Sequence, residues 1–193
     1  MIRSIRLNKL TLLAATLAAL LTVACRTAEA QVKPFKVSGE GVVEHIPLTP
    51  GDSASHWAVG HGTFLGHYFG EGFVRLDKFT SPTTADFSSS VPFVFTAANG
   101  DNLAFHYGRV DFGAAKPGNV TLTFLPDLGP TMVYAVFVAE FNPVPALCTG
   151  RFTKVTSGSF IMTATTEPFD LLNPVDVGYE WEGEGHLTFS KGK

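Results

Sequence analysis

Cysteine is nearly missing from this 193-residue sequence, which contains only Cys25 and Cys148. If an N-terminal leader is removed after residue 30, Cys148 stands alone and no internal disulfide can form. The fold must then depend on a hydrophobic core, and a domain of roughly 160 residues is large enough to build one. Cys148 follows two prolines and Leu147, and we expect it to be a small buried hydrophobic residue rather than a nucleophile.

Runs of lysine and arginine are also missing. Ten basic and sixteen acidic residues follow position 30, so the remaining chain is acidic. This charge disfavours phosphate backbones and anionic membranes as partners, and we expect no nucleic-acid partner. The sequence has no G-x-S-x-G, no glycine-rich turn leading into a helix and no compact H-x-H or H-E-x-x-H motif. These absences disfavour a serine hydrolase, a nucleotide site and a zinc protease, and no cofactor is expected.

The one long apolar run lies at the N-terminus. Arg3, Arg6 and Lys9 precede residues 10–24, which are almost entirely Leu, Ala, Thr and Val. At about 1.5 Å per residue, this run is too short to cross a hydrocarbon core of ~30 Å comfortably. Residues 28–30 read Ala-Glu-Ala, the small-residue pattern that signal peptidase cleaves. We therefore predict a signal peptide over residues 1–30 and export to the periplasm or the medium.

A different cut is the main alternative for this leader. Cleavage before Cys25 would give a lipoprotein anchored through that cysteine. The residue three positions upstream is Thr22, where such sites usually have leucine, so soluble release is favoured. An uncleaved membrane anchor is the third possibility.

Glycine and phenylalanine are abundant instead, at nineteen and seventeen residues, a mixture that favours strands over helices. The clearest period-2 alternation is at the C-terminus. One face would carry Tyr179, Trp181, Gly183, Gly185, Leu187 and Phe189, and the other Glu180, Glu182, Glu184, His186, Thr188 and Ser190. This pattern predicts a half-buried antiparallel strand with a solvent-exposed outer face, bent or bulged at its two glycines.

Further strands are predicted by shorter runs, and Asn99-Gly100 fits a two-residue hairpin turn. The other candidates are residues 35–45, 57–65, 72–79, 93–98, 101–108, 120–125, 132–141, 151–155 and 158–166. Residues 31–193 are thus expected to form a single all-β domain, a closed antiparallel barrel of about eight strands. Closure is favoured because it removes exposed strand edges, and a β-sandwich is the alternative.

Three turn-like segments occur in a familiar order. Residues 60–67 (GHGTFLGH) are similar to a G-x-G-T-H-L-G block, residues 96–101 match an A-N-G-D hairpin, and residues 149–152 (TGRF) resemble a G-T-G-R-F turn. In this succession the chain resembles exported bacterial proteins related to the allene oxide cyclase and dirigent-type eight-stranded barrels. The resemblance implies that barrel fold. No catalytic residue of those families is carried over to this chain. The chain departs from the quoted blocks at Phe64 and Cys148.

Histidines and carboxylates supply the candidate site residues. His61 and His67 are six residues apart, so an unbroken strand would put both imidazoles on one face, as weak candidates for a zinc or iron site. Exposed histidines that bind nothing are the simpler interpretation. Glu140 interrupts the apolar run 132–141, and a carboxylate buried there needs a partner, for which Arg109 and Arg151 are candidates.

We expect a non-enzymatic exported barrel that binds a small hydrophobic molecule or a protein partner. An eight-stranded barrel is just wide enough to hold one small ligand or to fill itself with side chains. The first alternative is a cyclase-, isomerase- or dirigent-type enzyme that uses Glu140 on a hydrophobic substrate. The second is a structural or interaction protein with a filled core. The volume at the centre of the barrel separates these expectations.

Overall fold

The computed structural model describes residues 30–173 and 175–191. Cys25 and the predicted leader up to residue 29 lie outside this part of the chain. The strands are β1 (Gln31–Val43), β2 (Ser53–Gly62), β3 (Gly66–Ser81), β4 (Thr84–Ala97), β5 (Asn102–Tyr107), β6 (Gly118–Phe124), β7 (Met132–Pro143), β8 (Val155–Thr166), β9 (Phe169–Asp170) and β10 (Val177–Phe189). Three short 3₁₀ helices accompany them: η1 (Val110–Phe112), η2 (Pro145–Leu147) and η3 (Gly150–Lys154). The predicted all-β class is confirmed.

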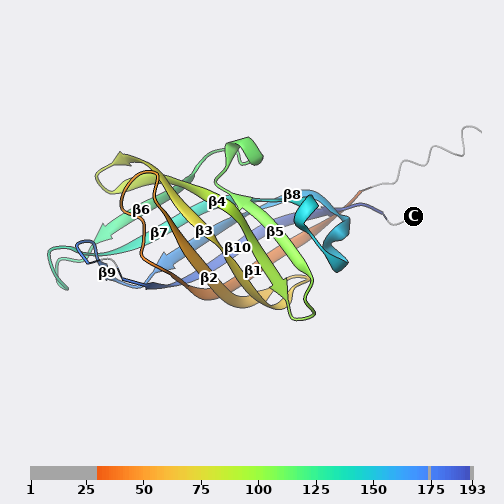
Figure 1. Cartoon of the computed structure of the whole chain (residues 1–193), viewed down its shortest axis with the longest axis horizontal. Helices are drawn as coiled ribbons and strands as arrows, with labels where there is room; N and C mark the ends of the chain where they lie inside the picture. The colour runs from red at the N-terminus through yellow and green to blue at the C-terminus, as the bar shows by residue number, and fades with distance from the viewer. Residues whose placement is uncertain (1–29, 174, 192–193) are drawn as a thin grey trace, which may run out of the picture.

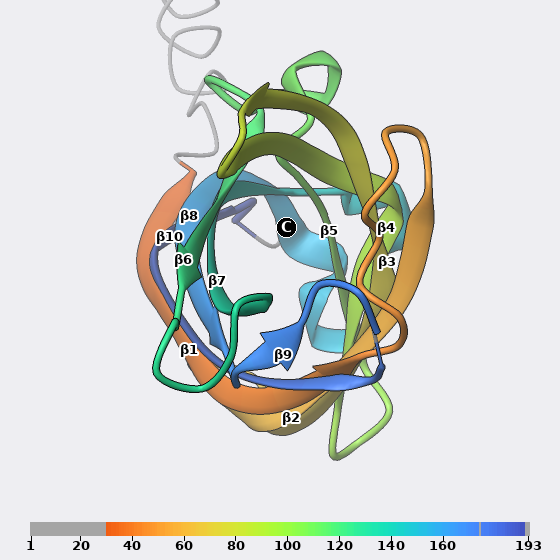
Figure 2. The same cartoon turned by 90° about the vertical axis from the view of Figure 1, so that its left-hand side faces the viewer.

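The strands close into one antiparallel barrel, seen from the side in Figure 1 and end-on in Figure 2. Going around the wall, β3, β2, β1, β10, β8 and β7 pair in that order. β5 and β6 occupy the same place between β7 and β4, and β4 pairs back to β3. The wall therefore has eight places, as predicted, and the sandwich alternative is excluded. β9 lies off this ring and pairs with the start of β7.

The shared place of β5 and β6 is interrupted by an excursion of the chain. Residues 108–117 leave the wall after β5, form η1, and return to begin β6. β5 pairs with β4 over Phe93–Thr96 and β6 pairs with β4 over Thr84–Phe87, both antiparallel. The two short strands thus run in the same direction and together make one stave of the barrel.

The alternation predicted for β10 is confirmed, because Trp181, Gly183 and Leu187 are buried whereas Glu182 and Glu184 are exposed. The bulge predicted at Gly183 and Gly185 is not formed. Both glycines pair in regular register with β1 and β8, and the register shift lies further on, at Thr188/Phe189. The glycines are needed for space, since a Cβ on Gly183 would lie 2.6 Å from the Phe160 ring.

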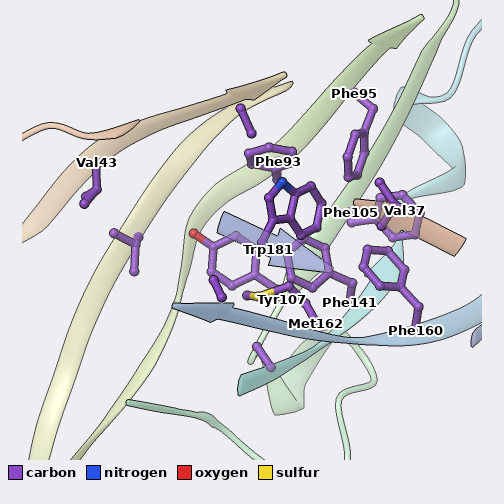
Figure 3. Close-up of a cluster of buried hydrophobic side chains, with 14 of the residues drawn as sticks. Val37, Val43, Phe93, Phe95, Phe105, Tyr107, Phe141, Phe160, Met162 and Trp181 are labelled. Carbon is purple, nitrogen blue, oxygen red and sulfur yellow. The ribbon is translucent and has the colours of Figure 1, made fainter. Parts of the chain in front are cut away.

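One end of the barrel is filled by aromatic rings. Phe35, Phe95, Phe105, Phe141 and Phe160 are at most 2% exposed. Their rings contact one another at centroid distances such as 4.6 Å between Phe141 and Phe160 and 5.1 Å between Phe105 and Phe160. Figure 3 shows Phe141 and Phe160 beside Trp181 in this cluster. These rings pack tightly, as expected where phenylalanine supplies most of the core volume.

The two ends of the barrel are closed differently. η2 and η3 lie at the end filled by aromatic rings, together with both ends of the described chain (Figure 1), and the η3 residue Phe152 is fully buried there. The opposite end carries the β1–β2, β6–β7 and β8–β10 connections. This second end, called the loop end below, is the part of the barrel that is not filled.

Several predicted strands have other bounds in the structure. Residues 57–65 do not form one strand, because β2 ends at Gly62 and a turn leads into β3 at Gly66. β4 begins at Thr84, well before the predicted strand 93–98, and residues 150–154 form η3 instead of a strand. The apolar run 132–141 forms most of β7, and its outer face is not fully covered, because Val138 there is exposed.

Candidate functional site

A cavity of about 60 Å³ lies inside the barrel at the loop end. Its fifteen lining residues come from all eight places of the wall and from the β1–β2 loop. The surface that they present is almost entirely carbon, with Phe93, Phe141, Met162 and Trp181 among them. Figure 3 shows these side chains together with Val43, which lies on the side of the loop end. The site therefore suits an apolar group.

One polar network is built into the wall of this cavity. His56 on β2 places Nδ1 3.1 Å from the Tyr179 hydroxyl and Nε2 2.9 Å from the Tyr107 hydroxyl. The Tyr179 hydroxyl lies 3.1 Å from the carbonyl oxygen of Trp57. The His56 ring also stacks on Phe93, with centroids 5.0 Å apart. Residues from β2, β5 and β10 are thus held together across the barrel interior.

The donor and acceptor of each hydrogen bond can be assigned by starting from the carbonyl oxygen of Trp57. The carbonyl of Trp57 accepts only, so the Tyr179 hydroxyl donates its single hydrogen to it. Tyr179 must then accept from His56 Nδ1–H, which leaves Nε2 of a neutral imidazole to accept from the Tyr107 hydroxyl. Every hydrogen of this network has an acceptor.

Burial keeps the network neutral. Loss of hydration lowers the pKa of His56 to about 4, because the charged imidazolium is disfavoured among apolar side chains. Burial likewise raises the pKa of Tyr107 and of Tyr179. These groups are therefore neutral at pH 7, and none of the described residues that line the cavity is a lysine or arginine that could pair with an anionic ligand.

A second, smaller cavity of about 30 Å³ lies next to the first. The two cavities share five lining residues, which are Ile46, Pro47, Val74, Phe87 and Phe137. Two of these shared residues, Ile46 and Pro47, belong to residues 45–48 of the β1–β2 loop, which we call the strap. Ile46 is 7% exposed, and Leu48 packs against the core.

The predicted residue Glu140 lies outside the cavity. It sits on the outer face of β7, between the inward Ala139 and Phe141. Its carboxylate accepts a 2.8 Å hydrogen bond from the backbone N–H of Ala115 and so ties the excursion 108–117 to the wall. Neither cavity is lined by an aspartate or glutamate among the described residues.

The two predicted partners of Glu140 are paired with other carboxylates. Arg109 contacts Asp111, with Nη2 2.5 Å from Oδ2, and its guanidinium lies over the Phe112 ring. Arg151 contacts Asp101 at 3.1 Å and donates to the carbonyl of Phe64. Both arginines therefore fasten surface segments, and the expected ion pair with Glu140 is not formed.

His61 and His67 are brought together, although not as one strand face. They are cross-strand partners on β2 and β3, and their exposed rings have centroids 3.6 Å apart. A protein metal site usually has three or four such ligands, and no group of three His, Cys, Asp or Glu suited to a metal is found in the described residues. Cys148 is buried, and burial raises the pKa of its thiol.

The fold and the site define a small closed β-barrel with a carbon-lined cavity at one end and a neutral Tyr–His–Tyr network in its wall. Searches against protein-family models, curated proteins and solved structures found no match for this chain. The resemblance to allene oxide cyclase and dirigent-type barrels therefore stays a prediction. In residues 30–173 and 175–191, no helix has the length and apolar character needed to span a membrane.

Proposed function

We propose that the protein is exported and that its barrel binds a small, uncharged hydrophobic molecule at the loop end. The observation that carries this proposal is the cavity itself. The aromatic core fills the barrel only to one end, and the remaining space is lined almost entirely by carbon. The hydrogens of the Tyr–His–Tyr network are bonded within the protein, and the buried Trp181 Nε1 is a lining donor without a partner among the described residues. An apolar group loses little by entering such a space and gains contacts there.

The volume sets a limit on the occupant. Typical sites for drug-sized ligands measure about 300–1,000 Å³, whereas the two cavities here measure about 60 and 30 Å³. A compact molecule of a few carbon atoms, or the end of a longer one, fits this description. Binding of anything larger requires the strap to move.

The small volume also favours a second candidate, a structural or interaction protein whose core is simply imperfectly filled. A few small voids are normal in protein interiors. The enzymatic alternative has less support, because the carboxylate on which it depended, Glu140, lies on the outer face.

Benzene is a suitable probe, because it is apolar and compact. We expect ligand-observed NMR to detect saturable benzene binding to the purified barrel and thermal unfolding to shift upward with benzene concentration. Ala164 lines the larger cavity and is 7% exposed, so Ala164→Leu should fill the space and abolish binding. The neighbouring Thr165 points outward and is exposed, which makes Thr165→Leu the matched control.

The two candidates give opposite results in this experiment. Saturable binding that Ala164→Leu removes and Thr165→Leu keeps supports the ligand-binding function. If benzene binds neither the original chain nor the control while both remain folded by near-ultraviolet circular dichroism, the filled-core candidate is favoured. Where benzene does bind, native mass spectrometry of protein from its own host would identify the natural occupant by mass. N-terminal sequencing of the same sample would test cleavage after residue 30.

A further inference from the structure

The strap is held in place by side chains rather than by its backbone. Among the described residues, no backbone hydrogen bond joins residues 45–48 to the rest of the barrel. The nearest such bonds are on either side, from Glu44 to Ser55 and from Gly51 to Leu76. The strap is therefore suspended between two fixed points.

Two kinds of side-chain contact hold it down. Ile46 and Leu48 insert among the core residues, and Ile46 and Pro47 form part of the lining of both cavities. His45 Nδ1 lies 3.3 Å from Asp176 Oδ1 on the β8–β10 connection, with both side chains exposed. An exposed pair of this kind contributes little, so burial of two aliphatic side chains is the main restraint.

His45 marks one hinge of this segment. Its φ angle is +54°, in the left-handed region that non-glycine residues rarely adopt. The other side of the strap has Gly51, whose φ is +96° and whose Cα faces open space. Neither residue belongs to a strand. Although the Gly51 N–H donates to the Leu76 carbonyl, glycine can change its backbone angles there without steric cost.

We propose that the strap is a lid, and that a ligand reaches the barrel interior when Ile46 and Leu48 swing out and join the two cavities into one. This inference rests on the proposed function. Opening breaks no backbone hydrogen bond, and an entering apolar molecule restores the apolar contacts that the strap gives up. Val74, Phe87 and Phe137, the three shared lining residues outside the strap, would then line one continuous space.

The experiment locks the strap where His45 and Asp176 already meet. The variant His45→Cys/Asp176→Cys, made with Cys148→Ala so that no other thiol follows residue 30, is treated with a short bifunctional maleimide. The same triple variant without the cross-linker is the control, and benzene is the probe for both. We expect cross-linking to slow benzene association at least tenfold, as measured by NMR exchange, and the untreated variant to bind like the original chain.

Each outcome has one meaning. Equal association rates before and after cross-linking would overturn the lid, while leaving the ligand-binding function intact. If neither the untreated variant nor the original chain binds benzene, the ligand-binding function itself is overturned. A second variant, Ile46→Ala, tests the same idea without chemistry: it removes the side chain that separates the cavities and should accelerate association, and an unchanged rate would count against the lid.

Discussion

Acidification should destabilise this barrel, and His56 should contribute a large share of the loss. Its pKa is lowered by burial to about 4, whereas an imidazole in the unfolded chain titrates near 6.5. Between pH 6.5 and 4, His56 binds a proton in the unfolded chain but not in the folded barrel. The contribution of His56 to the free energy of unfolding is therefore fully present above about pH 6.5 and is lost as the pH falls toward 4. At 1.36 kcal/mol per pKa unit, the full loss is about 3 kcal/mol, a large fraction of the 5–15 kcal/mol typical of a domain.

The substitution His56→Gln isolates this effect. The Gln amide remains neutral at every pH, and it offers one donor for Tyr179 and one acceptor for Tyr107. Urea unfolding followed by tryptophan fluorescence at pH 7, 6, 5 and 4.5 gives the free energy of unfolding of both proteins. We expect the original chain to lose stability over this range and His56→Gln to lose about 2–3 kcal/mol less.

Comparing the original chain with His56→Gln cancels the contributions of the other titrating groups. Burial also lowers the pKa of His106, but this group is present in both proteins and cancels in the difference. His186→Gln, which removes an exposed imidazole, serves as the control and should keep the pH dependence of the original chain. Parallel pH profiles for the original chain and His56→Gln would refute the buried neutral network.

Three further changes test the core and its only described cysteine. Phe105→Ala removes a fully buried ring and should cost about 3–5 kcal/mol in urea unfolding. Gly70→Ala would place a Cβ 2.5 Å from the Phe93 ring, and we expect a loss of about 1–3 kcal/mol in the same assay; a loss below 0.5 kcal/mol would show that the ring yields freely. Cys148 is buried and its pKa is raised, so Ellman's reagent should modify it slowly in buffer and rapidly in urea; equal rates would contradict its burial.

Local patterns were enough to predict the class of the fold and part of the cavity wall. Strict alternation over residues 179–190 put Tyr179 and Trp181 on one face, and both line the cavity. A hairpin at Asn99-Gly100 is confirmed, but the two-residue turn is wrong: β4 ends at Ala97, β5 begins at Asn102, and Gly100 has a positive φ (+84°) whereas Asn99 does not. These features depend on neighbours in sequence, which is why a pattern of period two suffices.

The function of Glu140 could not be predicted in this way. Its apolar neighbours suggested burial, but Ala139 and Phe141 take the inward positions and leave the carboxylate outside. Its carboxylate accepts a hydrogen bond from the backbone N–H of Ala115, and no local sequence pattern predicts the excursion to which Ala115 belongs. Arg109 emerges in the same excursion, two residues before the aspartate that binds it.

His56 is the residue that sequence reasoning missed. A signal was present, because Ala54 and Ala58 flank it at spacing two and both are buried. Its hydroxyl partners are 51 and 123 residues away, on strands that come together only when the barrel closes. A network assembled across a closed wall leaves no trace in the spacing of its members.

The interrupted stave gives the barrel a natural point for attachment. Residues 115–117 are exposed, and the ladders of β5 and β6 hold the wall closed on either side without them. A peptide tag or a reporter domain inserted there would project from the side of the barrel, away from the loop end. The barrel therefore has an exposed insertion site that is separate from the interior cavity.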